Sequence, residues 1–181
     1  MATTKKPEPH EFVTKASPHA LVQPYMSSVD SSPRYWHDGE LWSVLADAPC
    51  TDGSFSMFDI YGTRGAGAPP HESSEADAFY YMLEGSADML IGAEVRRVNK
   101  GDFVFIPHGT AHARRTSSDS ARMLYARTPA GFERLLQARG ERTTSAEPPA
   151  PDWTGQEISA ERRHALMDDL GLRQVAVPNP F

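Results

Sequence analysis

The 181 residues are enough for one domain with a substantial core, and 39% hydrophobic with 23% charged residues is ordinary for a soluble globular protein. A net charge of -6 gives no electrostatic reason to expect a nucleic-acid partner, and no apolar run approaches the roughly 18 residues of a membrane-spanning helix. The beginning of the chain has no apolar segment typical of a secretory signal, and the single cysteine, Cys50, cannot form an internal disulfide. We therefore expect a cytoplasmic protein.

Short runs of alternating apolar and polar residues, separated by turns rich in Gly, Pro, Asn and Asp, dominate the centre of the chain. Such runs predict half-buried strands. About eight to ten short strands at this spacing indicate an all-β antiparallel sandwich or barrel rather than parallel βαβ units. The clearest expected strands are residues 40–46, 54–61, 77–83, 87–91, 94–98, 103–106, 112–116 and 123–127.

Two helices are expected after the last strand. Residues 130–139 carry apolar side chains on one face and precede Gly140, a typical helix stop. Residues 159–170 begin with Ser159, which suits a helix N-cap, and precede Gly171. The predicted organisation is thus an N-terminal arm (1–32), a barrel (33–128) and a C-terminal helical extension packed on it (129–181).

Two blocks in the middle of the chain carry a recognisable pattern. The first runs from Gly65 to Gly85 and contains Pro-Pro-His after a Gly-rich turn and a closing Leu-Glu-Gly. The second runs from Gly101 to His112 and reads G, five residues, P, one residue, G, two residues, H. The chain resembles the cupins, and among them the small single-domain relatives of quercetin dioxygenase. The resemblance implies a jelly-roll β-barrel.

The resemblance also implies a metal site in the barrel, with three histidines and one glutamate holding one divalent ion. His71 and His112 occupy two of these positions, but Ser73 and Ala78 stand at the other two. Glu75, in a loop, could replace a missing ligand, so a His71/His112/Glu75 site for Fe, Ni, Mn, Cu or Zn is conceivable if a metal binds. Without a metal, the two histidines could be acid–base groups or satisfied core residues.

The period of two along a strand predicts which other side chains face the interior. Counting from His112 places Arg114 inward, where a cation could hold a carboxylate, enolate or phenolate, unless a shift of one residue turns it outward. The same parity places Ala78, Tyr80 and Met82 inside. The Tyr80 hydroxyl could then donate a hydrogen bond to a substrate, although a structural role is the commoner one.

Three functional hypotheses follow from these residues. The favoured one is an enzyme, without a required cofactor, that performs acid–base chemistry on a bulky, aromatic or polyketide-like molecule of secondary metabolism. Its catalytic residues would be His71, His112, Arg114 and Tyr80, and the reaction a cyclisation, isomerisation or dehydration. The alternatives are a metal-dependent dioxygenase of the quercetinase type and a non-catalytic small-molecule binder. The resemblance further implies a homodimer.

Overall fold

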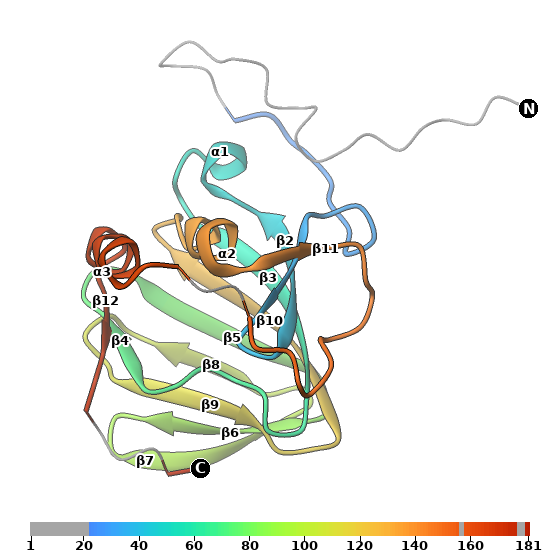
Figure 1. The fold of residues 1–181 in the computed structure, drawn as a ribbon, viewed down its shortest axis with the longest axis vertical. Helices are drawn as coiled ribbons and strands as arrows, with labels where there is room; N and C mark the ends of the chain where they lie inside the picture. The colour runs from blue at the N-terminus through green and yellow to red at the C-terminus, as the bar shows by residue number, and fades with distance from the viewer. Residues whose placement is uncertain (1–21, 156–157, 177–179) are drawn as a thin grey trace, which may run out of the picture.

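The computed structural model describes residues 22–155, 158–176 and 180–181; the first 21 residues of the predicted arm lie outside them. Two facing antiparallel sheets form the body of the protein, which confirms the predicted all-β jelly-roll fold (Figure 1). The strands are β1 (Arg34–His37), β2 (Glu40–Ala46), β3 (Ser56–Thr63), β4 (His71–Ser73), β5 (Asp77–Glu84), β6 (Ser86–Ile91), β7 (Glu94–Asn99), β8 (Phe103–Ile106), β9 (His112–Thr116), β10 (Ser120–Thr128), β11 (Glu141–Thr143) and β12 (Leu172–Gln174).

The larger sheet has the order β11-β1-β2-β3-β10-β5-β8, and the smaller one β12-β4-β9-β6-β7. The C-terminal part of the chain therefore adds one strand to each sheet, besides its helices. β12 pairs with β4 and brings Gln174 opposite His71, whereas β11 pairs with β1. β11 and β12, which follow residue 128, are thus built into the same sheets that carry the two sequence blocks.

Side chains that alternate inward along β3, β5 and β10 fill the space between the sheets. Phe58 and Ile60 are fully buried, as are Tyr80 and Met82 to within a few per cent. Four aromatic rings make up the centre, with centroids 5.5 to 5.8 Å apart: Trp42, Phe58, Tyr125 and Phe132. The expected inward parity of β5 is confirmed, since Tyr81 between the buried positions is exposed.

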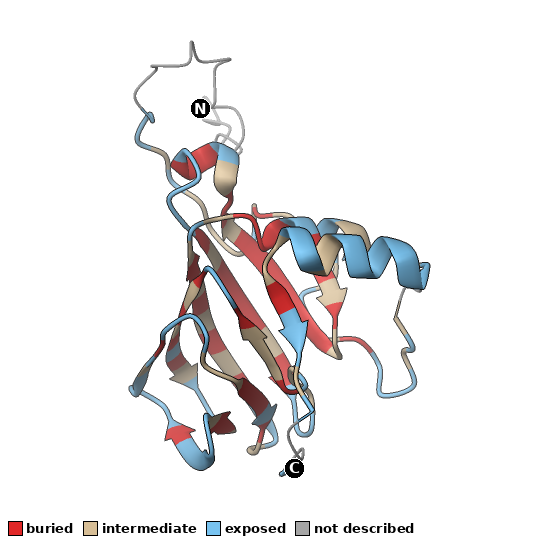
Figure 2. Ribbon diagram, turned by 90° about the vertical axis from the view of Figure 1, so that its left-hand side faces the viewer, coloured by how far each residue is buried: buried red, intermediate tan, exposed pale blue. Residues whose placement is uncertain are grey.

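Three helices lie at one end of the sheets (Figure 1): α1 (Ala48–Thr51), α2 (Glu133–Arg139) and α3 (Ala160–Asp169). The connection between β2 and β3 contains the single turn α1, capped by the Asp47 side chain. α2 begins later than predicted because Gly131 has a φ of 124°, which no right-handed helix accommodates. α3 has its predicted Ser159 cap, and Figure 2 shows it largely exposed.

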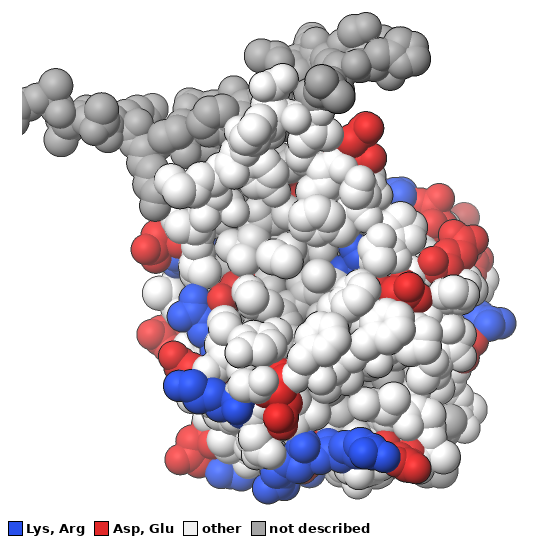
Figure 3. Space-filling model, turned by 180° about the vertical axis from the view of Figure 1, so that it is seen from behind, with Lys and Arg blue, Asp and Glu red and all other residues white. Residues whose placement is uncertain are grey.

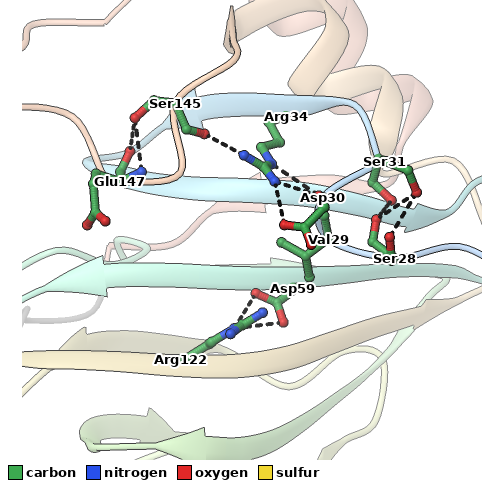
Figure 4. A network of polar contacts seen from close by, with 10 residues as sticks. Ser28, Val29, Asp30, Ser31, Arg34, Asp59, Arg122, Ser145 and Glu147 are labelled. Carbon is green, nitrogen blue, oxygen red and sulfur yellow. Dashed lines mark hydrogen bonds and ion pairs between the residues drawn. The ribbon is translucent and has the colours of Figure 1, made fainter.

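Polar contacts fasten the segment before β1 to the outer side of the larger sheet (Figure 4). The Arg34 guanidinium donates to the Val29 and Ser145 carbonyls, and Arg122 donates to Asp59 across β10 and β3.

Figure 3 shows a face where charged side chains of both signs border a broad uncharged area. No helix in the described part of the chain is long and apolar enough to cross a membrane.

Candidate functional site

The two histidines of the sequence blocks meet between β4 and β9. His71 and His112 are directly paired partners in the two antiparallel strands, and their ring centroids are 4.2 Å apart. His71 Nδ1 lies 2.8 Å from the Pro69 carbonyl oxygen, and His112 Nδ1 lies 3.0 Å from that of Thr110. A carbonyl oxygen only accepts, so each Nδ1 carries the hydrogen. Each neutral ring therefore presents an Nε2 lone pair, and that of His112 is buried without a partner among the described residues.

The surroundings of this pair disfavour the charged imidazolium. Desolvation, with the neighbouring His112 as the next cause, lowers the pKa of His71 from 6.5 to about 3. Desolvation also lowers the pKa of His112, although the bond to the Thr110 carbonyl opposes the shift. The cations Arg114 and Arg127 lower both values further. Both rings are hence neutral near pH 7 and available as proton acceptors.

Arg114 points into the barrel, as its parity predicts, and only 3% of it is exposed. Its two terminal nitrogens donate to the two carboxylate oxygens of Glu40, which is fully buried on β2. The guanidinium also lies 5.6 Å from the Trp42 ring centroid and 6.0 Å from that of Tyr80. The inward cation therefore holds a carboxylate of the protein itself, which offsets its charge. The sequence pattern held no sign of Glu40, which is 74 residues away.

A cavity of about 60 Å³ adjoins His71 and opens beside α2 and β12. Its wall includes the aromatic rings of Trp42, Tyr80, Tyr125 and Phe132, and Tyr80 stacks on Tyr125 with centroids 4.7 Å apart. Burial raises the pKa of both tyrosines, so their hydroxyls keep their protons at neutral pH. The lining residues that matter here are Trp42, His71, Tyr80, Arg114, Tyr125 and Phe132. Three of the four proposed catalytic side chains line this cavity; His112 lies behind His71.

A second buried arginine, Arg127, lies next to Ser73 and Ala78, the two motif positions that lack the expected metal ligands. Ala78 on β5 pairs directly with Arg127 on β10, and Arg127 Nη2 donates to the Ser73 hydroxyl at 2.8 Å. Arg127 is 4% exposed and packs on the Phe132 ring at 5.3 Å. Glu75, in contrast, is exposed, so the structure does not bring it to the two histidines.

The comparisons with known proteins agree with this architecture. The sequence profile of the Cupin domain family matches residues 61–126, which include both blocks and the strands between them. The chain therefore contains a cupin domain over residues 61–126. Quercetin 2,3-dioxygenase of Bacillus subtilis is 26% identical to it over 118 residues, which are 65% of this chain and 35% of that enzyme. This cupin therefore spans about a third of the length of that relative.

Several solved structures share the fold at low sequence identity. KdgF from Halomonas sp. has a TM-score of 0.55 at 18% identity, covering 62% of this cupin and 99% of that chain. The Streptomyces nucleoside dehydratase Pac13 has a TM-score of 0.52 at 21% identity, covering 70% of this cupin and the whole of the other chain. An RmlC-like cupin from Shewanella frigidimarina has a TM-score of 0.54 at 15% identity, covering 61% and 96%.

The donor set of this cupin does not fit the metal expected from the resemblance. His71 and His112 have the orientation of metal-binding histidines, with Nδ1 bonded to a carbonyl. The other two positions are Ser73, whose hydroxyl already accepts a hydrogen bond from the Arg127 guanidinium, and Ala78, whose methyl group cannot bind a metal. The positive charge of the guanidinium would also repel a metal cation. Within residues 22–155, 158–176 and 180–181, no three His, Cys, Asp or Glu residues gather where they could hold a metal ion.

Arg127 is the site residue that sequence reasoning missed. Its signal was present, because inward positions alternate along β10 from Ala121 through Met123 and Tyr125 to Arg127. The same parity that placed Arg114 inside would have placed Arg127 inside. Its relation to Ser73, 54 residues earlier, is decided by how the two sheets face each other.

Proposed function

We propose that this cupin is an enzyme that moves a proton on a small molecule bound in the barrel, by acid–base chemistry without a metal. The observation that carries the proposal is the pair of neutral imidazoles, His71 and His112, each held by a backbone carbonyl with Nε2 free. A cyclisation, an isomerisation and a dehydration each need a base that removes a proton and an acid that delivers one.

His71 is the proton acceptor in this mechanism, because it lines the cavity while His112 lies behind it. The substrate's C–H or O–H bond breaks, its electron pair stays on the substrate, and the proton goes to His71 Nε2. Desolvation disfavours the resulting imidazolium, which therefore returns the proton readily to another carbon or to a departing hydroxyl. His112, whose ring adjoins that of His71, lowers the pKa of His71 further and so favours return of the proton to the substrate.

Tyr80 and Arg114 stabilise the negative charge that develops on a substrate oxygen. The Tyr80 hydroxyl keeps its proton, since burial raises its pKa, and it can donate to that oxygen. The terminal nitrogens of Arg114 both donate to Glu40, so they do not serve as donors to the substrate oxygen. The Nε of Arg114 has no partner among the described residues and remains available as a donor.

The aromatic wall supports a flat, partly unsaturated substrate. The cavity of about 60 Å³ holds one reacting portion of a bulky aromatic or polyketide-like molecule. A second hollow shares Arg139, Met167, Leu172 and Gln174 with the cavity and continues along α3, where the rest of such a molecule would extend. The nucleoside dehydratase Pac13 uses the same fold for a dehydration, and the likeness to it concerns the fold alone.

The test uses chelator-treated protein and a panel of aromatic and polyketide-like hydroxyketones in D₂O. Mass spectrometry would detect loss of water, a changed retention time or uptake of deuterium. We expect turnover without added metal and a loss of about 10²- to 10⁴-fold in kcat in His71→Gln and His112→Gln. His108→Gln, in the exposed turn between β8 and β9 and outside the lining of both hollows, is the control and retains full activity.

Two outcomes would contradict the proposal. Turnover that requires Fe, Ni, Mn, Cu or Zn and is abolished by a chelator would favour a metal-dependent enzyme. Saturable binding without any chemical change or deuterium uptake in the bound compound would favour a binding protein.

A further inference from the structure

Arg127 is a buried cation without a carboxylate partner among the described residues. It is 4% exposed, its Nη2 donates to the neutral Ser73 hydroxyl, and its Nη1 is buried without a hydrogen-bond partner. The contrast with Arg114 is sharp, because Arg114 is equally buried but holds both oxygens of Glu40. A charge that is buried and unpaired destabilises a protein unless a ligand of opposite charge meets it.

Arg127 has a relation to each of the four positions at which the cupin pattern places metal ligands: strand pairing at one, a hydrogen bond at another, and an electrostatic effect on the two histidines. Arg127 pairs with Ala78 across β10 and β5, and it donates to Ser73. Its positive charge acts on both His71 and His112, where it lowers the pKa. The positive charge of Arg127 is therefore present in the part of the barrel where the cupin pattern implies a bound metal ion.

Of the two buried arginines, only Arg114 is paired with a carboxylate among the described residues; the buried Glu133 carboxylate accepts from Ser56 and Gly131 and does not reach Arg127. Arg114 and Glu40 cancel, and both histidines are neutral. A monoanion would balance Arg127. The planar guanidinium also suits a carboxylate, because one free Nη presents donors in the plane of the group.

We infer that Arg127 takes the place of the divalent cation in this cupin and binds the carboxylate, or a comparable oxyanion, of a small substrate through its free Nη1. The inference rests on the proposed function and names its substrate class: an anionic molecule whose charged group is held next to the two histidines. Arg127 does not itself line the cavity but packs on the Phe132 ring, which does, so the anion must pass His71 and Phe132 to reach Nη1. Arg127 thereby positions the substrate, and His71 performs the proton transfer.

Acetate and acetamide test this inference, since they have nearly the same shape and differ in charge. Calorimetric titration at constant ionic strength is expected to give saturable binding of acetate, with acetamide at least tenfold weaker. The acetate affinity should fall at least tenfold in Arg127→Met and much less in Arg127→Lys, which keeps the charge. Arg122→Met is the matched control, because it removes an arginine from the same strand on the outer face and should bind acetate like the native protein.

The ¹⁵N signals of the His71 and His112 rings locate the bound acetate, and they should move on titration in the native protein but not in Arg127→Met. Equal affinity of the native protein and Arg127→Met for acetate, or equal affinity of the native protein for acetate and acetamide, would overturn the inference. Histidine-dependent turnover of a neutral compound together with either result would leave the proposed function standing. If acetate binding depends on Arg127 but the protein binds the panel compounds without converting them, the inference stands and the proposed enzymatic function fails.

Discussion

The depressed pKa of His71 makes a quantitative prediction for stability against pH. The pKa is about 3 in the folded protein and 6.5 as the ordinary value, which applies to the unfolded chain. Above pH 6.5 the ring is neutral in both states and has no effect on the pH dependence. As the pH falls from 6.5 towards 3, the unfolded chain takes up a proton that the folded protein does not, so the folded state loses stability.

The expected loss follows from about 1.4 kcal/mol for each pH unit and proton. At pH 5.0, about 1.5 units below the ordinary value, His71 should lower the free energy of unfolding by about 2 kcal/mol relative to pH 7.5. His71→Gln cannot take up this proton. The native protein should therefore lose about 2 kcal/mol more than the variant between these pH values.

Urea unfolding, followed by tryptophan fluorescence at pH 7.5 and 5.0, measures both differences. Carboxylates and the other histidines titrate in both proteins, so their contributions largely cancel in the comparison. Equal losses for the native protein and His71→Gln would refute the reasoning. An NMR titration in which the His71 ring protonates near pH 6.5 would refute it as well.

Three further predictions concern charge, metal and assembly. Glu40→Gln leaves Arg114 buried without a counter-ion and should lower the free energy of unfolding by about 3–5 kcal/mol in urea unfolding. The double variant Glu40→Leu with Arg114→Leu should recover most of this loss. Additive losses from the two single changes would contradict this. Elemental analysis should find the same metal content in the native protein and Glu75→Ala, because Glu75 is exposed, and one metal per chain lost in the variant would contradict this. We also propose a homodimer through the exposed aromatic rings of β8: light scattering should give a lower mass for Phe103→Ser combined with Phe105→Ser, and an unchanged mass would exclude this surface.

Local pattern was sufficient for much of the fold. The period of two placed Ala78, Tyr80 and Met82 on the inner face of β5, because successive side chains of a strand point to opposite faces whatever their partners are. The spacing of the second block placed His112 at the start of β9.

Local pattern failed where a residue's state depends on a partner far along the chain. The sequence by itself determined an all-β antiparallel fold, and its resemblance to the cupins implied a jelly-roll barrel with His71 and His112 at one site. Strand parity placed Arg114 inside unless the register shifted by one residue. Only the tertiary structure decided that Glu40 offsets Arg114 and that Glu75 remains outside. The physical reason is that strand parity is a property of the backbone, whereas the charge state of a buried site depends on side chains that antiparallel pairing brings from distant segments.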